Sequence, residues 1–287
     1  MLASASMLKP TRGSGVSDVH SAGRGRILAL GWGNIFSESL DGGETWREET
    51  PFGRKSPARV GVTAEDNPLV GTDKGALFER TAEGWTETPI KGLSRVEAIA
   101  STSGATLVAG KMLLRRAAGG AEWVSAVPSI KKLHVALVAA AGDVLYASLC
   151  DPKGRAWLVR SDDHGATWTE QSAVLPAKVE SLSAFGARAV AAVMGGAAFF
   201  TKDHGRQWAP IVLPEYGPYN QGFVAVTDRA IYSLLRGASL ASLFCSTDDG
   251  VTWERGESVS SASAMWTSSD GVHISSLSGF VLRVPAP

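Results

Sequence analysis

The chain consists of short segments in which apolar and polar residues alternate, separated by glycine, serine or aspartate. Within residues 95–117 the segments read RVEAIAS, ATLVAG and MLLRRA, and within residues 178–202 they read KVESLSA, RAVAAVM and AAFFTK. A period of two is typical of β-strands, whose successive side chains point to opposite faces of a sheet. No segment shows a helical period of convincing length. The sequence therefore predicts an all-β fold.

One eight-residue pattern, Ser/Thr-x-Asp-x-Gly-x-x-Trp, occurs four times, at residues 39–46, 161–168, 201–208 and 246–253. Its retained residues are Asp41, Gly43 and Trp46, Asp163, Gly165 and Trp168, Asp203, Gly205 and Trp208, and Asp248, Gly250 and Trp253. Asp accepts hydrogen bonds from backbone N–H groups just ahead of it, and Gly adopts the positive φ of a tight hairpin. Trp supplies a large apolar side chain that anchors the next strand. The pattern therefore predicts a structural turn.

The copy that reads SDDHGATW also brings Ser, Asp and His together, a combination that catalytic sites use. However, His164 of this copy is replaced by Gly42 in the first copy and by Asp249 in the last. A catalytic His is not expected to be replaceable among copies of one unit, whereas turn chemistry accounts for every retained residue. We therefore interpret the cluster as part of a turn.

The spacing of the Trp residues predicts the number of repeats. Two weaker copies, RAAGGAEW at 116–123 and RTAEGW at 80–85, fill the gap between the first two full copies. The six Trp residues are then 38 to 45 residues apart, about 41 on average, and 287 residues hold seven such units. Four-stranded propeller blades have this length. The sequence predicts a single domain over 1–287 that forms a seven-bladed β-propeller of four-stranded antiparallel blades.

The two ends of the chain are expected to share one blade. The segment SASMLKP ends at Pro10, 41 residues before Pro51, and resembles a fourth strand without a blade of its own. Residues 262–287 contain further strands with no Asp-Gly-Trp pattern after them. We therefore expect residues 2–9 to pair with 262–287, which removes the open sheet edge that a ring would otherwise leave.

The repeated pattern resembles the Asp-box, or BNR repeat, of sialidase-like β-propellers. The resemblance implies a structural hairpin between the third and fourth strands of a blade, and a binding or catalytic pocket on the opposite face. The sialidase apparatus itself does not match. The Arg-Ile-Pro motif is missing from RGRILALGW, no Tyr/Glu pair is recognisable, and the connectors are short. The chain looks more like compact non-catalytic members such as the photosystem II stability/assembly factor type.

Composition adds few constraints on function. The 28 basic and 28 acidic side chains balance, so attraction of the whole molecule to nucleic acid is not indicated. No apolar run is long enough for a membrane span, and the start of the chain lacks a signal-peptide pattern, so we expect a cytoplasmic monomer. Cys150 and Cys245 follow no metal spacing and are interpreted as free thiols. The sequence predicts no metal site and no cofactor.

Sorting the charges by this repeat predicts a basic rim on the face that carries the connectors between blades. Thirteen basic residues fall there: Lys9, Arg12, Arg54, Lys55, Arg59, Lys91, Arg95, Lys131, Lys132, Lys153, Arg155, Lys178 and Arg236. The opposite face, with the Asp-Gly-Trp turns, collects acidic residues. We therefore expect a protein partner with an acidic surface, or an anionic ligand, on the connector face. The predicted anchors are Arg59, Arg95, Tyr216, Tyr219 and Trp266.

The first strand of each blade is expected to line the central channel. Early polar positions of these strands are Asp18, Glu97, His134 and Glu180. Three carboxylates and a His near one axis suit general acid/base chemistry, as in a glycoside hydrolase or a lyase. Polar residues also line such channels simply because the channel holds water. Short loops and the missing motif favour a non-enzymatic binding scaffold, and the hydrolase or lyase is kept as the alternative.

Overall fold

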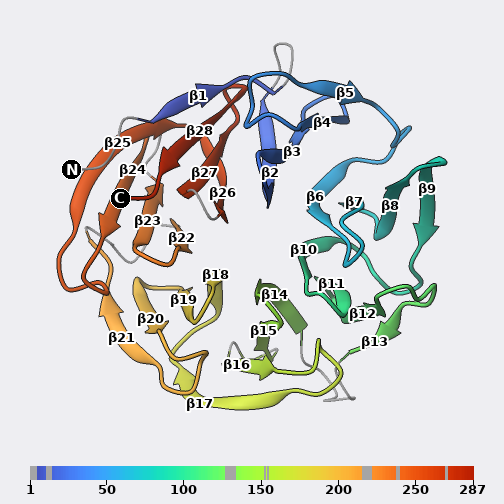
Figure 1. Ribbon diagram of the computed structural model, residues 1–287. Coiled ribbons are helices and arrows are strands. Elements are labelled where there is room, and N and C mark those ends of the chain that lie inside the picture. The colour runs from blue at the N-terminus through green and yellow to red at the C-terminus, as the bar shows by residue number, and fades with distance from the viewer. Residues whose placement is uncertain are drawn as a thin grey trace.

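The computed structural model describes residues 5–10, 15–126, 134–151, 153, 155–214, 222–236, 240–268 and 271–287. Its strands form seven four-stranded antiparallel sheets arranged around a central axis (Figure 1). The alternating segments fold into consecutive hairpins, and the first strand of each blade lies innermost. The predicted seven-bladed β-propeller is confirmed.

The first three blades contain twelve strands, numbered along the chain. Blade 1 comprises β2 (Val16–Gly23), β3 (Arg26–Gly31), β4 (Ile35–Ser39) and β5 (Arg47–Glu49). Blade 2 comprises β6 (Pro57–Val62), β7 (Pro68–Thr72), β8 (Ala76–Thr81) and β9 (Gly84–Pro89). Blade 3 comprises β10 (Val96–Ser101), β11 (Ala105–Gly110), β12 (Leu113–Ala117) and β13 (Val124–Ser125).

Blades 4 to 6 follow the same order. Blade 4 comprises β14 (His134–Ala141), β15 (Val144–Cys150), β16 (Ala156–Ser161) and β17 (Thr169–Leu175). Blade 5 comprises β18 (Val179–Phe185), β19 (Arg188–Val193), β20 (Ala197–Thr201) and β21 (Ala209–Val212). Blade 6 comprises β22 (Gly222–Val226), β23 (Ile231–Arg236), β24 (Leu240–Ser246) and β25 (Glu254–Ser260).

Blade 7 is assembled from both ends of the described chain. Its inner strands are β26 (Ala262–Ser268), β27 (Gly271–Ser276) and β28 (Phe280–Pro285), and its outer strand is β1 (Ser6–Leu8). β1 pairs with β28 in antiparallel register, with Met7 opposite Leu282. The predicted closure of the last blade by an N-terminal strand is therefore confirmed. β1 thus covers the edge of β28 and completes the fourth strand of the blade.

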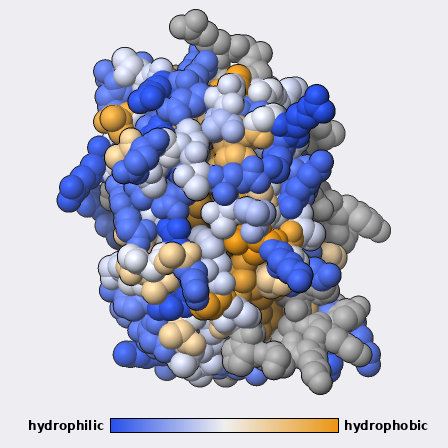
Figure 2. Space-filling view, turned by 90° about the vertical axis from the view of Figure 1, so that its right-hand side faces the viewer, coloured by the Kyte–Doolittle hydropathy of each residue, from blue (hydrophilic) through white to orange (hydrophobic). Residues whose placement is uncertain are grey.

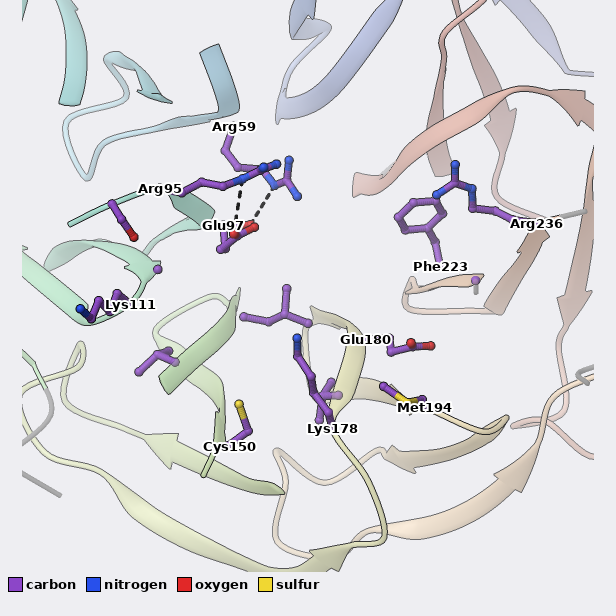
Figure 3. A pocket seen from close by; sticks show the side chains of 16 residues that line it. Arg59, Arg95, Glu97, Lys111, Cys150, Lys178, Glu180, Met194, Phe223 and Arg236 are labelled. Atoms are coloured by element: carbon purple, nitrogen blue, oxygen red, sulfur yellow. Dashed lines mark hydrogen bonds and ion pairs between the residues drawn. The ribbon is translucent and has the colours of Figure 1, made fainter. Parts of the chain in front are cut away.

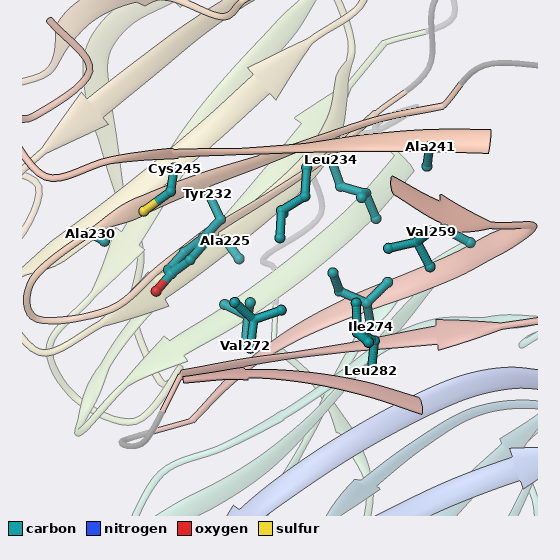
Figure 4. Packing of buried hydrophobic residues seen from close by; sticks show 13 residues of the cluster. Ala225, Ala230, Tyr232, Leu234, Ala241, Cys245, Val259, Val272, Ile274 and Leu282 are labelled. Atoms are coloured by element: carbon teal, nitrogen blue, oxygen red, sulfur yellow. The ribbon is translucent and has the colours of Figure 1, made fainter. Parts of the chain in front are cut away.

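The apolar core lies between neighbouring blades. At the interface of blades 6 and 7, Tyr232, Leu234 and Val259 pack against Val272, Ile274 and Leu282 (Figure 4). Neighbouring blades approach each other closely at a glycine, which has no side chain. A Cβ atom added to Gly71 of β7 would lie 2.4 Å from Cβ of Val96 in the next blade, so only glycine fits there.

The outer wall of the ring is mostly hydrophilic. Figure 2 shows the side of the molecule at the right of Figure 1, where polar side chains surround a narrow band of apolar residues. The outer strands β9 and β13 on this side are largely exposed. The core therefore sits in the spaces between blades rather than under the outer strands.

The Asp-Gly-Trp turns have the hydrogen bonds that the sequence predicts. In blade 4, Asp163 Oδ1 accepts hydrogen bonds from the Ser161 hydroxyl (2.7 Å) and the Thr167 N–H (2.8 Å). Ser161 Oγ in turn accepts from the Gly165 N–H (2.8 Å). Desolvation raises the pKa of Asp163, but the hydrogen bonds from Thr167 and Ser161 outweigh it and lower the pKa to about 2.

The variable position before the glycine also has a left-handed backbone. The φ angle is 57° at His164, 59° at His204 and 61° at Asp249, and it is 78° at Gly42. His, Asp and Gly are residues that tolerate this region better than most others do. This requirement explains why these three types alternate at a position that the sequence comparison found replaceable.

The face that carries these turns is not uniformly acidic, in contrast to the prediction from sorted charges. Arg26 pairs with Asp66 (2.9 Å), and Arg188 pairs with Asp249 (2.8 Å), each across a blade boundary. Arg160 pairs with Asp162 within blade 4. The arginines lie within strands rather than loops, so sorting the loop residues missed them.

Removal of residues 1–10 should destabilise the ring. The deletion takes away the β1–β28 ladder, in which each hydrogen bond contributes about 1 kcal/mol, and exposes the edge of β28. We expect a lower melting temperature and concentration-dependent aggregation. The control is Met7→Ser, because Met7 is 58% exposed in the same strand. A deletion variant that melts like the full chain would show that the closure contributes nothing.

Replacement of Asp163 by Ala should lower the free energy of unfolding by about 1–3 kcal/mol, the range for lost hydrogen bonds to a charged acceptor. Thermal or urea unfolding measures the change. Glu44→Gln is a suitable control, since Glu44 is exposed in the equivalent turn of blade 1. Unchanged stability of Asp163→Ala would contradict a structural role for the turn.

Candidate functional site

A pocket of about 740 Å³ opens at the centre of the connector face, the face formed by the loops between blades and by the second-to-third strand loops. The side chains and backbone around it come from blades 2 to 6 (Figure 3). Its charged lining residues are Arg59, Arg95, Glu97, Lys111, Lys178, Glu180 and Arg236. Five cationic side chains thus surround the pocket with two carboxylates.

A recurring irregularity of the inner strands places the carboxylates at the mouth of the channel. The register of β10 on β11 shifts between Val96 and Ala98, and that of β18 on β19 shifts between Val179 and Ser181. The extra residues are Glu97 and Glu180. A bulge re-aims a side chain at a strand end. The inner strands of blades 1, 2, 4 and 7 have register shifts at the same end.

Two arginines are held in place by blade 3. Arg59 Nε donates a hydrogen bond to the Glu97 carbonyl oxygen (2.8 Å), and its Nη1 donates to the carbonyl of Ala58 (2.7 Å). Arg95 forms an ion pair with the Glu97 carboxylate (3.3 Å) and is 53% exposed. The guanidinium of Arg59 is therefore fixed by backbone groups, whereas Arg95 partly neutralises Glu97 at the surface.

The other three cations approach the pocket from blades 3, 5 and 6. Lys111 and Lys178 form no ion pair with any residue that the structure describes. Arg236 lies over the ring of Phe223, with its guanidinium 5.9 Å from the ring centroid. Such a cation over an aromatic face provides a platform for both charge and stacking.

One part of the pocket is apolar. Leu137 and Met194 line it, and Met194 is 53% exposed, whereas the lining residues Val135 and Val179 are almost fully buried. Together with Phe223 they form an apolar wall next to the cations. The arrangement suits a ligand that carries negative charge together with an apolar group.

The predicted site residues divide into three groups. Arg59, Arg95, Glu97 and Glu180 line the pocket together. Trp266 is not among its described lining residues, because its ring packs against His20 with centroids 4.4 Å apart. Tyr216 and Tyr219 lie outside the described residues, as does the side chain of His134, whose backbone belongs to β14.

Asp18 lies in the channel wall. It is 7% exposed, and its Oδ2 accepts a hydrogen bond from the N–H of Val60 in the next blade (2.9 Å). Burial raises the pKa of Asp18, while Arg59 and the N–H groups of Val60 and Val19 oppose the rise. The carboxylate therefore joins blade 1 to blade 2 and does not line the pocket.

Other polar residues of the inner strands join blades in the same way. Ser181 Oγ accepts from the N–H of Val224 in blade 6 (2.9 Å). Ser263 Oγ of blade 7 donates to the carbonyl of Val16 in blade 1 (2.7 Å). Polar side chains in the channel thus satisfy backbone groups between adjacent inner strands, which is a structural role.

Sequence reasoning missed four residues on the connector face: Trp32, Lys111, Met194 and Phe223. Trp32 is 55% exposed in the β3–β4 loop, and its backbone N–H donates to the carbonyl of Gly15 (2.9 Å). Lys111 and Met194 belong to loops between second and third strands. Their position in those loops was a usable signal, since these loops share a face with the connectors. Phe223 gave no such signal.

The described residues contain neither a candidate metal cluster nor a candidate membrane span. No group of three or more His, Cys, Asp or Glu residues in the described ranges is placed to hold a metal ion. The described part of the chain also lacks any helix with the length and apolar character of a membrane span.

Solved structures share the fold at low sequence identity. YCF48 from Cyanidioschyzon merolae is 17% identical over 99% of both chains, with a TM-score of 0.69. A structure of YCF48 bound to D1 peptide is 16% identical over 99% of this chain and 95% of that chain, with a TM-score of 0.70. Virginiamycin B lyase from Staphylococcus aureus is 11% identical over 99% of both chains, with a TM-score of 0.77.

These likenesses show the architecture alone. No protein family model matches the chain, and no curated protein matches it. The relation to the sialidase-like Asp-box family therefore stays a prediction from the sequence. The comparisons support a seven-bladed β-propeller that shares its architecture with YCF48 and virginiamycin B lyase.

Two replacements of Asp18 separate a structural role from a catalytic one. Asp18→Asn keeps an oxygen acceptor for the Val60 N–H and removes a buried charge, so stability near neutral pH should be kept or raised. Asp18→Ala leaves that N–H unpaired and should lower the free energy of unfolding by about 1–3 kcal/mol. Melting temperatures of both variants test this. A loss of stability in Asp18→Asn as large as in Asp18→Ala would contradict the hydrogen-bonding role.

Proposed function

We propose that the protein is a non-enzymatic β-propeller scaffold that binds an acidic segment of a protein partner at the connector-face pocket. The observation that carries the proposal is the lining of this pocket, with five cationic side chains and two carboxylates. The whole molecule is neutral, so this concentration of positive charge is local. An anionic peptide segment is attracted to this pocket, whereas the neutral molecule as a whole has no general attraction to polyanions.

The cations are suited to recognition for two reasons. Lys111 and Lys178 have no ion-pair partner among the described residues, so binding an acidic group does not require breaking an existing pair. Arg236 and Phe223 form a stacked pair beside the apolar wall. A partner segment with acidic residues next to an apolar or aromatic residue matches both parts of the pocket.

The structural neighbours support binding of this kind. The YCF48 structure bound to D1 peptide shows that a propeller of this architecture takes a peptide. The identity of 16% carries no residue-level correspondence. The proposal for this chain therefore rests on its own pocket. Scaffolds that bind in this way include assembly factors and inhibitor or immunity proteins, and we place this protein in that class.

A lyase or glycoside hydrolase remains the second candidate, because Glu97 and Glu180 line the same pocket and virginiamycin B lyase shares the fold. Glu97 is paired with Arg95, and Asp18 lies in the wall, which leaves this candidate with fewer available acid/base groups than the sequence suggested. Activity on chromogenic glycosides or cyclic depsipeptides that is lost in both Glu97→Gln and Glu180→Gln would establish the enzyme instead.

Reversal of the unpaired cations should weaken binding of acidic peptides. The probe is a random peptide library selected on the immobilised wild-type protein. We expect selected peptides to be rich in Asp and Glu, and their affinity to fall at least about tenfold in Lys111→Glu/Lys178→Glu. The association rate of the wild type should fall as the salt concentration rises.

Two controls locate the effect. Lys91→Glu makes the same type of replacement, at a single exposed connector residue that does not line the pocket, and it should bind nearly as the wild type does. Glu44→Gln alters the opposite face and should have little effect. Selected peptides that lack acidic residues, or that bind the double variant unchanged, would contradict the proposal. Arg59 is a poor choice for this test, because its guanidinium holds backbone carbonyls.

A further inference from the structure

A second pocket lies on the opposite face, at the boundary where blade 7 meets blade 1. Its volume is about 320 Å³. The β2–β3 hairpin contributes Arg24, the turn of blade 1 contributes Asp41 and Gly42, and blade 7 contributes His273 and Arg283. We call this space the seam pocket. It is separate from the connector-face pocket, so the two sites can be tested independently.

Two other blade boundaries show what can fill this place. In two of the other Asp-Gly-Trp turns, the residue before the glycine contacts the preceding blade through its side chain. In blade 4, His164 contacts Thr102 of blade 3, with its Nδ1 3.1 Å from the Thr102 hydroxyl. In blade 6, the Asp249 carboxylate pairs with Arg188 (2.8 Å) and Lys202 (2.9 Å) of blade 5. The boundary is thus closed by a side chain.

At the boundary between blades 7 and 1 this residue is Gly42, which has no side chain. A Cβ atom added to Gly42 would lie 3.8 Å from Nη1 of Arg283, an ordinary contact distance. Space is therefore free beside an arginine, at the position that corresponds to the Asp249 side chain of blade 6. Asp249 pairs with Arg188 of a second strand, whereas Arg283 belongs to a third strand. The missing side chain accounts for the pocket.

One residue beneath the turn is also polar at this boundary, although the turn glycine Gly43 itself packs on Leu8 of β1. Leu107 lies opposite Arg115 in blade 3, and Tyr146 lies opposite Arg160 in blade 4. These apolar and aromatic side chains pack under the turn glycines of the following blades. The corresponding residue of blade 7 is His273, which lies opposite Arg283 and is 1% exposed. A buried His replaces a hydrophobic residue here.

The charges of the seam pocket favour an anion. Arg24 and Arg283 supply two guanidinium groups, and the imidazole of His273 lies on the pocket wall. The one carboxylate in the described lining is Asp41, whose oxygens accept hydrogen bonds from Thr45 and Ser39 within the turn. Guanidinium groups are the side chains best matched to the geometry of carboxylate and phosphate.

We propose that the seam pocket binds a small oxyanion, either a carboxylate or a phosphate, which takes the place of the side chain that Gly42 lacks. The anion joins Arg283 of blade 7 to the turn of blade 1, as Asp249 joins blades 5 and 6. Binding therefore holds the ring closed at the boundary where the two ends of the chain meet. A site of this kind couples the stability of the propeller to the concentration of an anionic metabolite.

The test is the melting temperature as a function of sodium phosphate or sodium malonate, at constant ionic strength and pH. For the wild type we expect a rise that follows the logarithm of the anion concentration, and saturable binding by calorimetry. Gly42→Asp supplies a tethered carboxylate, and the left-handed φ of Asp249 shows that Asp fits this position. This variant should melt above the wild type without added anion and lose at least about tenfold in anion affinity.

Two further variants complete the comparison. Arg283→Gln should lose the response to both anions, and Arg206→Gln, an exposed arginine on the same face of blade 5, should keep it. If Arg283→Gln does not fold, Gly42→Asp alone decides the result. The proposal is overturned if neither anion binds the wild type in a saturable way, or if Gly42→Asp retains the full response.

Discussion

Each blade is a sheet with two faces, and the only cover available to either face is the neighbouring blade. This constraint explains most of the structure. The buried residues gather between blades, as with Tyr232 and Leu234 against Val272 and Ile274. The polar groups that lie at those boundaries must also find partners across them. Asp18, Ser181 and Ser263 do so through backbone groups of the adjacent inner strand. Arg26 and Arg188 do so through carboxylates.

The fold was readable in the sequence because its signals are local and repeated. Trp46, Trp168, Trp208 and Trp253 mark the unit length, and the alternating segments between them mark the strands. The closure of the ring was also predictable, because an extra strand at one end matched a missing strand at the other. The bounds of the outer strands were predicted less accurately. For example, β13 covers only two residues, since the segment around Trp123 belongs mainly to the turn.

The candidate site was less predictable, because it depends on geometry that periodicity does not encode. The positions of the loops correctly predicted that Arg59, Arg95, Lys178 and Arg236 lie on one face. The bulges that bring Glu97 and Glu180 to the pocket have no sequence pattern of their own. Asp18 is only one residue further along its strand than the equivalent bulge position, yet it is buried in the wall. The pairing of surface acids also escaped prediction, since the arginines concerned lie in strands, and Arg26 and Arg188 belong to a different blade from their partners.

The closure of the ring has a consequence for how the chain is made. Among the described strands β1 precedes all others along the chain and its partner β28 follows all others, so β1 stays unpaired while the strands between them are synthesised. Contacts of such sequence separation, like that between Ser263 and Val16, form late and slowly. A long apolar β1 would invite pairing with other nascent chains during that time. The three-residue length of β1, with Ser6 and Met7 on the surface, keeps that hazard small.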